Sequence, residues 1–158
     1  MTNVYELDAR TIHPSTDGRL ADLAGRVTLI VNVASECGYT PQYSGLQALH
    51  AELEGRGFSV AAFPCNQFGA QEPGDSAQIA EFCSSRFDVT FPVFEKADVK
   101  GDDRSPVWAA VEEKLGAVPG WNFCKVLVGR EGNVIGFYES GVAPDDAQLR
   151  EDLEAALG

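Results

Sequence analysis

Two short stretches of the chain are apolar at almost every position: "VTLIVNV" at 27–33 and "FSVAAF" at 58–63. A strand with one face in water alternates apolar and polar residues. A continuous, β-branched apolar run is instead typical of a strand buried on both faces of a parallel sheet. We therefore predict that both stretches are central strands of an α/β sheet.

The segment between these strands has the apolar spacing of a helix, which Gly55 and Gly57 end. After "YTPQ", one predicted helix face holds Tyr43, Leu46, Leu49, His50 and Leu53. Strand, helix and strand make a βαβ unit, whose crossover is expected to be right-handed.

A second helix is predicted after the loop "PCNQFGAQEPG". Asp75 is followed three residues later by Gln78, which is the pattern of a capping box at the start of a helix. Helical spacing then places five residues on one face: Ile79, Phe82, Cys83, Arg86 and Phe87. The following "FPVFEKADV" predicts a short strand with its flanks.

The last third of the chain predicts a helix, a hairpin and a second helix. Ser105 and Pro106 are typical of a helix cap and a first helical position, and the expected inward residues are Val107, Trp108, Val111 and Leu115. The runs "WNFCKVLV" and "NVIGFYE" flank the turn "GREG", which indicates a β-hairpin. A final helix starts near Asp145 and is expected to bury Leu149, Leu153 and Leu157.

The order of these elements predicts a single domain over residues 1–158 with a thioredoxin-like α/β fold. About the first two dozen residues form an N-terminal β extension, and a helical insertion around 66–100 follows the second core strand. A chain of 158 residues is long enough to bury a core of its own.

Composition and charge exclude several classes of function. A net charge of −12 argues against nucleic acid and anionic lipid as partners. No apolar run approaches the roughly 18 residues of a membrane span. The start "MTNVYELDAR" has no secretory pattern, so we expect a cytoplasmic protein. The four cysteines lack zinc-site spacing and the chain has no GxGxxG loop, so we expect neither metal nor cofactor.

Four side chains far apart in sequence are predicted to meet at one edge of the sheet. Cys37 follows the first core strand, and Gln71 follows the second. Ligand sites of open α/β sheets lie at the carboxyl ends of the parallel strands. Trp121 and Asn122 stand at the start of the hairpin's first strand. If that strand runs antiparallel to the other two, its start lies at the same edge.

The cysteine at this junction is suited to nucleophilic chemistry. We expect the thiol of Cys37 to be exposed and to face the free N–H groups at the start of the following helix, which favour the reactive thiolate. The side chains of Gln71, Trp121 and Asn122 would add uncharged N–H donors. Such donors stabilise a thiolate, or an oxygen anion that develops in a reaction at the sulfur.

Three long blocks resemble the signatures of the glutathione peroxidase family, with cysteine where some members carry selenocysteine: "NVASECGYTPQYSGLQAL", "FPCNQFGAQEPG" and "WNFCKVLV". The likeness extends over nearly the whole chain. The resemblance implies that Cys37, Gln71, Trp121 and Asn122 are the active-site tetrad. It also implies that a thiol reduces hydrogen peroxide and organic hydroperoxides, leaving Cys37 as a sulfenic acid.

The partner that resolves this sulfenic acid is not supplied by a C-x-x-C motif, because Thr40 stands where the second cysteine would be. The block "EFCSSRFDVTFPVF" resembles the one that holds the resolving cysteine of thioredoxin-dependent members, which implies Cys83 and thioredoxin as the reductant. A cysteine on an apolar helix face is also common as core filler. As resolver, Cys83 is expected to start out of reach, so that part of 76–90 unwinds.

The remaining residues of interest carry weaker expectations. Cys65 is expected to be structural, and Cys124 departs from the family pattern, with an alternative resolving role left open. His50 is interpreted as a helix-face residue and His13 as a loop residue. Only "GAVPG" precedes Trp121, where tetrameric relatives carry a long insertion, so we expect a monomer.

Three other functions remain open on sequence alone. A general disulfide reductase on the same fold is disfavoured by Thr40. A peroxide sensor that passes its oxidation to a partner protein would use the same thiol. A glutathione-dependent peroxidase is disfavoured because the arginines that hold glutathione in selenium-type members have no clear match.

Overall fold

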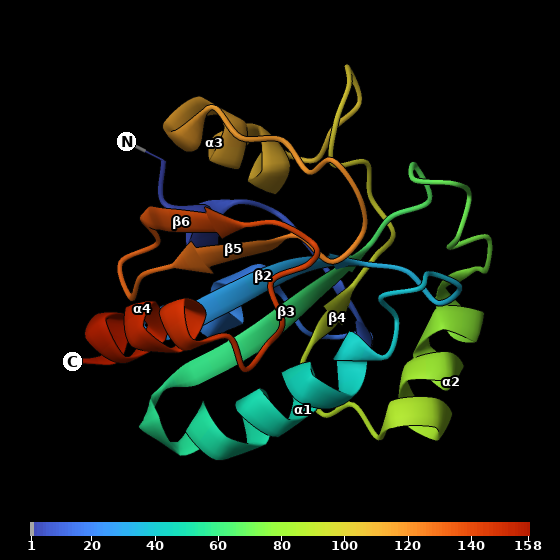
Figure 1. The fold of residues 1–158 in the computed structure, drawn as a ribbon. Coiled ribbons are helices and arrows are strands. Elements are labelled where there is room, and N and C mark those ends of the chain that lie inside the picture. Colours follow the sequence, from blue (N-terminus) through green and yellow to red (C-terminus); the bar gives the residue numbers. More distant parts are fainter. Residues whose placement is uncertain (1) are drawn as a thin grey trace.

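The computed structural model describes residues 2–158, which form a six-stranded mixed sheet covered by helices on both faces (Figure 1). The order across the sheet is β1-β4-β3-β2-β5-β6. The strands are β1 (Thr11–His13), β2 (Val27–Val33), β3 (Phe58–Pro64), β4 (Val93–Phe94), β5 (Lys125–Val128) and β6 (Val134–Tyr138). The α-helices are α1 (Gln42–Leu53), α2 (Ser76–Phe87), α3 (Pro106–Leu115) and α4 (Ala147–Leu157). Short 3-10 helices are η1 (Val4–Glu6), η2 (Leu20–Leu23) and η3 (Glu54–Arg56).

The two predicted central strands, β2 and β3, are parallel neighbours, and every one of their residues is buried. β5 runs antiparallel to β2, with Val31 opposite Lys125. The carboxyl ends of β2 and β3 therefore lie at the same edge of the sheet as the start of β5. The prediction of a shared edge for the candidate residues is confirmed.

Each face of the sheet packs on its own apolar core. The core beneath α1, α2 and α4 includes Leu29, Val31 and Val33 of β2, whereas Ile30 faces the core beneath α3, η1 and η2. Figure 1 shows α1 and α4 on one side of the sheet and α3 on the other. Successive strand residues point to opposite faces, so two covered faces require the unbroken apolar pattern of β2.

Three helices start with side-chain caps, and the sequence predicts two of these caps, at Asp75 and Ser105. Asp75 accepts from the N–H of Gln78 while Gln78 accepts from the N–H of Asp75, both at 2.9 Å. Ser105 accepts from the N–H of Trp108, and Asp146 caps α4. These caps satisfy first-turn N–H groups that have no partner within a helix.

Three expectations differ from the structure. Leu115 is 36% exposed, because α3 ends there and Gly116 turns the chain in the left-handed conformation. His13 lies in β1 and not in a loop, and its ring bonds to the carbonyl of Val89. Trp121 and Asn122 occupy the loop before β5, which begins at Lys125. The β extension itself is confirmed, since β1 pairs with β4 at the sheet edge.

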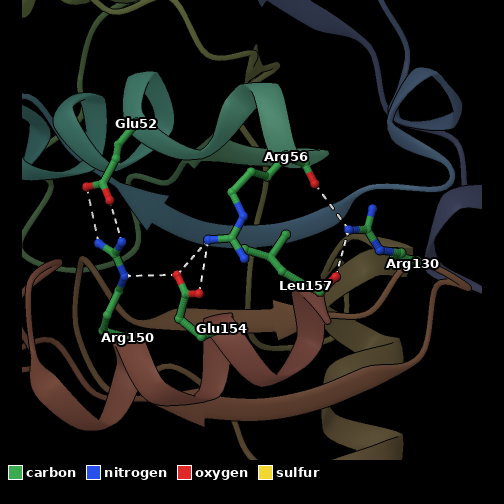
Figure 2. Close-up of polar contacts among 6 residues, drawn as sticks. All are labelled: Glu52, Arg56, Arg130, Arg150, Glu154 and Leu157. Carbon is green, nitrogen blue, oxygen red and sulfur yellow. Dashed lines mark hydrogen bonds and ion pairs between the residues drawn. The ribbon is translucent and has the colours of Figure 1, made fainter.

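The edge opposite the candidate site is held together by arginines (Figure 2). The guanidinium of Arg130, in the β5–β6 turn, donates to the carbonyls of Leu157 and Arg56 at 3.1 Å each. It also donates to Gly25 at 3.1 Å and to Gly57 at 3.5 Å. One side chain thus joins the ends of η3 and α4 to the turns that precede β2 and β3.

Gly57 is required at this contact. Its φ of 85° lies in the left-handed region, and a Cβ there would come within 2.6 Å of the Arg130 guanidinium. Two ion pairs lie beside the Arg130 contacts, Arg56 with Glu154 and Arg150 with Glu52 (Figure 2). These pairs are solvent-exposed, and such pairs contribute little to stability.

Within residues 2–158, the structure has no helix that combines the length and the apolar character needed to cross a membrane.

The hydrogen bonds of Arg130 predict a loss of stability when its side chain is removed. Replacing Arg130 by Ala removes charged hydrogen bonds to four carbonyls, so the free energy of unfolding should fall by about 2 kcal/mol. Arg56→Ala is the matched control, because it removes only an exposed ion pair and should cost about 0.5 kcal/mol. Denaturant unfolding of both variants measures the difference. Equal losses would contradict the role assigned to Arg130.

Candidate active site

The loops after β2 and β3 and the loop before β5 meet at the edge of the sheet that lies on the right in Figure 1. Cys37 lies in the first loop and Gln71 in the second. Trp121 and Asn122 lie in the third. The backbone N–H of Glu36 donates to the carbonyl of Gln71 at 3.0 Å, so the first two loops are directly bonded.

The turn around Cys37 is braced by Thr40. The N–H of Cys37 donates to the Thr40 hydroxyl at 2.9 Å, and that hydroxyl donates to the carbonyl of Ala34 at 2.8 Å. The position of the missing second cysteine therefore holds a buried hydroxyl that fixes the turn. Thr40 also donates its own N–H to the carbonyl of Cys37 at 3.0 Å.

The sulfur of Cys37 is covered, contrary to the expectation of an exposed thiol. The residue is 6% exposed and belongs to the core on the α1 side of the sheet. Its Sγ accepts from the N–H of Tyr39 at 3.3 Å. This donor belongs to the turn before α1, which starts only at Gln42, so the hydrogen bond to the sulfur comes from the turn and not from the helix.

Gln71 and Asn122 are bonded to each other. The amide of Asn122 donates to Oε1 of Gln71 at 3.1 Å, while Oδ1 of Asn122 is buried without a hydrogen-bond partner. Among residues 2–158, none of the side chains of Gln71, Trp121 and Asn122 donates to the sulfur of Cys37. The three loops converge, and the two carboxamides already form a pair beside the thiol loop.

Trp121 is the exposed member of the group, at 37%. Its ring lies against Phe68, with centroids 5.7 Å apart. It also lies over Gly69, where a Cβ would come within 3.2 Å of the indole and 3.4 Å of the Gln71 amide. Gly69 and Ala70 both adopt left-handed backbone conformations, which turns the chain sharply just before Gln71.

Asn32, at the end of β2, positions the Trp121–Asn122 loop, and sequence reasoning missed it. Its side chain donates to the carbonyl of Trp121 and accepts from the N–H of Cys124, both at 2.9 Å. Its backbone also bonds to Phe123 and Cys124. The available signal was a polar residue inside an otherwise apolar strand.

Buried Lys125 fixes the other end of this loop. Its ammonium donates to the carbonyls of Ser140 and Val142, and the Ser140 hydroxyl donates to the carbonyl of Asn122. Burial lowers the pKa of Lys125 to about 8. The loop that carries Asn122 is thus bonded on both sides by buried polar groups.

Glu72, next to Gln71, is a second residue that sequence reasoning missed. It is 1% exposed, and its Oε1 accepts from the N–H of Ser35 at 3.2 Å and from the Ser35 hydroxyl at 2.6 Å. Oε2 is buried and has no hydrogen-bond partner. Burial raises the pKa of Glu72 to about 7. Nothing in the loop pattern "FGAQEPG" indicated that this carboxyl is enclosed.

Cys83 is fully buried on the inner face of α2, and its thiol donates to the hydroxyl of Tyr43 at 3.6 Å. Burial raises the pKa of Cys83 to about 11. All four cysteines are free, so Cys37 and Cys83 are not joined in this structure.

The other residues singled out lie at structural positions. The thiol of Cys65 donates to Gln67 Oε1 at 3.4 Å, and that of Cys124 donates to the carbonyl of Trp121 at 3.4 Å. His50 accepts from the N–H of Val60 and packs on Phe91. In the part of the chain that the structure describes, no group of three or more His, Cys, Asp or Glu could hold a metal ion.

The chain is similar in sequence and in structure to several known proteins. The family model for glutathione peroxidase matches residues 4–112. The glutathione peroxidase-like peroxiredoxin gpx1 of Schizosaccharomyces pombe is 47% identical over 164 residues, covering 99% of this chain and 100% of that protein. The hydroperoxy fatty acid reductase gpx1 of Synechocystis sp. is 46% identical over 151 residues, covering 87% and 86%. The crystal structure of T. cruzi GPX1 matches with a TM-score of 0.74 at 30% identity, over 99% of this chain and 97% of that one.

The contacts of Asn32 predict a large cost for its removal. Asn32→Ala would leave the buried N–H of Cys124 without a partner and the carbonyl of Trp121 with only the thiol of Cys124 as a donor, so the free energy of unfolding should fall by about 2 kcal/mol. Gln47→Ala is the matched control, because Gln47 likewise donates and accepts but bonds to exposed Thr90. That control should cost about 0.5 kcal/mol. Denaturant unfolding compares the two, and an Asn32 variant as stable as the control would refute this role.

Proposed function

Because the chain belongs to the glutathione peroxidase family and is a thiol peroxidase that reduces hydroperoxides, we propose that Cys37 is its peroxide-reacting thiol. Gln71, Trp121 and Asn122 complete the proposed active site. The observation that carries this proposal is the convergence of three loops around a thiol whose sulfur already accepts an N–H bond. Cys65 directly follows β3 at the same edge, but burial raises the pKa of its thiol, which disfavours the reactive thiolate.

The first chemical step is attack of the Cys37 thiolate on one peroxide oxygen. The S–O bond forms, the O–O bond breaks, and the electron pair leaves on the second oxygen, which takes a proton to become water or an alcohol. Uncharged N–H donors stabilise that developing oxygen anion without a counter-ion. Asn122 donates to Oε1 of Gln71, which leaves the amide N–H groups of Gln71 available for the peroxide.

The second step converts the sulfenic acid of Cys37 into a disulfide with Cys83. Cys83 lies on α2, of which only Ile79 and Cys83 are buried, while Phe82 and Phe87 pack against the core from partly exposed positions. Helices with few buried contacts open at low free-energy cost, so unwinding of α2 can bring the two sulfurs together. Thioredoxin then reduces the disulfide by thiol–disulfide exchange.

The proposed substrates are hydrogen peroxide and organic hydroperoxides, including those of fatty acids. A relative at 46% identity is named a hydroperoxy fatty acid reductase. Large apolar side chains lie exposed near the thiol loop, among them Tyr39 and Trp121. An open apolar rim gives an alkyl chain a surface to lie against while its peroxide group reaches the thiol.

Assembly and location complete the proposal. We expect the protein to act as one domain and as a monomer in the cytoplasm, with no metal or cofactor in its reaction. The disulfide reductase alternative is weakened further, because the Thr40 hydroxyl is used to brace the Cys37 turn.

The proposal predicts different effects for the two cysteines in an NADPH-coupled peroxidase assay. Cys37→Ser should abolish turnover with thioredoxin and with glutathione alike, because it removes the nucleophile. Cys83→Ser should still consume about one equivalent of peroxide, while thioredoxin-driven turnover falls by about 100-fold. Cys65→Ser is the matched control, since Cys65 is a second buried thiol that donates to Oε1 of Gln67, and this variant should retain activity.

Three results would contradict parts of this function. Fast turnover of Cys83→Ser with glutathione alone would make glutathione the reductant. Slow turnover of the wild type, together with a long-lived Cys37 mixed disulfide to another protein, would favour a sensor. Peroxide consumption by Cys37→Ser would remove Cys37 from the chemistry.

A further inference from the structure

Glu72 is a buried carboxyl between the loop of Cys37 and helix α2. The carboxyl is bonded to the Cys37 loop through Ser35, which lies two residues before Cys37 in the chain. Ser35 donates both its N–H and its hydroxyl to Oε1 of Glu72. On the other side, Glu72 and Ser35 line a groove of about 520 Å³ together with Ile79 and Phe82 of α2. The carboxyl therefore lies at the boundary across which the two proposed redox cysteines must meet.

The second oxygen of this carboxyl is free to exchange a proton. Oε2 is buried and has no hydrogen-bond partner. Charged and titratable groups from several elements surround this carboxyl. The charges of Lys96 and Glu36 act on its pKa, and Arg86 lines the same groove. In turn, burial and the charge of Glu72 both raise the pKa of Tyr43 and of Cys83. Its charge contributes to the raised pKa of Cys83, so the carboxyl lies within electrostatic range of that thiol.

Formation of the disulfide requires a proton to move. The Cys83 thiol must lose its proton to become a nucleophile, and the hydroxyl of the Cys37 sulfenic acid must gain one to leave as water. We propose, on the basis of the function proposed above, that Glu72 is the acid–base residue that carries this proton from Cys83 to the leaving hydroxyl. The carboxylate accepts the proton, the S–S bond forms as the S–O bond breaks, and Glu72 returns the proton to the departing oxygen. One water is released, and no other oxidant or reductant is needed.

The neighbouring groups are poorly suited to this transfer. Gln71, Trp121 and Asn122 carry no side chain that titrates near neutral pH. Burial raises the pKa of Tyr43 well above its ordinary value. Burial raises the pKa of Glu72 to about 7, where a carboxyl exchanges protons in both directions at neutral pH.

Glu72 is also anchored independently of α2. Its backbone N–H donates to Asn66 Oδ1 at 2.9 Å, and its carbonyl accepts from the Lys96 ammonium at 3.0 Å. α2 begins only at Ser76. Unwinding of the helix can therefore bring Cys83 towards the rim while Glu72 stays bonded to the Cys37 loop.

Single-turnover experiments separate the two chemical steps. Reduced protein is mixed with one equivalent of hydrogen peroxide between about pH 5 and about pH 9. Sulfenic acid is trapped with dimedone after different delays, and disulfide is measured by intact mass spectrometry. The variants are Glu72→Gln, which removes the acid, Glu72→Asp, which keeps a carboxyl, and Glu131→Gln, a control on an exposed carboxyl in the turn between β5 and β6.

The proposal predicts a selective effect on the second step. In Glu72→Gln, Cys37 should be oxidised within about twofold of the wild-type rate, while disulfide formation slows at least tenfold near about pH 7. The inflection of the wild-type disulfide rate near about pH 7 should disappear in Glu72→Gln and persist, shifted, in Glu72→Asp. Glu131→Gln should match the wild type in both steps.

Unfolding measurements give a second readout that does not depend on the chemistry. The pKa of Glu72 is raised from 4.5 to about 7 on folding, so its stabilising contribution is complete below 4.5 and is lost as the pH rises towards 7. The wild type should lose more stability than Glu72→Gln across this window. Equal pH dependence of the two proteins would show that the carboxyl does not titrate as proposed.

Two further results would overturn the proposal. One is a Glu72→Gln variant that forms the disulfide at the wild-type rate with the same pH profile. The other is a variant that slows both steps equally, which would make Glu72 only a brace for the loop. If instead the wild type accumulates sulfenic acid and never joins Cys37 to Cys83, the assignment of Cys83 itself is wrong, and this role falls with it.

Discussion

The bonding of Asn32 across the rim of the sheet is the constraint on which the proposed site depends. Its side chain bonds to the backbone of Trp121 and Cys124, and its main chain bonds to Phe123 and Cys124. The end of β2 and the start of β5 are thereby held in register, just where one continues towards Cys37 and the other begins after Asn122. The Glu36–Gln71 backbone bond adds the third loop. Covering both faces of the sheet makes these strands rigid, so short loops suffice to bring distant residues together.

The chemistry around the thiol contrasts with that around its proposed partner. Cys37 lies in the apolar core on the α1 side of the sheet, and its sulfur accepts a backbone N–H bond. Cys83 is held in its protonated form by burial beside Tyr43. In the proposed mechanism, Cys37 reacts with peroxide in the folded state, and Cys83 becomes reactive only when α2 moves. Glu72, the only buried carboxyl of residues 2–158, lies between these two environments.

Much of the fold could be predicted, because burial on both faces leaves an unmistakable apolar run in β2 and β3, and because the caps Asp75 and Ser105 act locally. The convergence of Cys37, Gln71, Trp121 and Asn122 followed from strand direction alone. The burial of Cys37 and Glu72 could not be read from loop sequences, since it depends on which distant side chains cover them. Leu115 was predicted to be buried from its helical spacing, but it is exposed because the helix ends at that residue.

The central claim is that the carboxamides of Gln71 and Asn122 accelerate the reaction of Cys37 with peroxide. The most direct test is the second-order rate constant for oxidation of Cys37 by hydrogen peroxide, followed by stopped-flow fluorescence, in the wild type and in a variant with Gln71→Ala and Asn122→Ala. The rate constant of the variant should be lower by about 100-fold or more, the usual cost of removing donors from a developing oxygen anion. A rate constant within about twofold of the wild type, in a protein that is still folded, would contradict it.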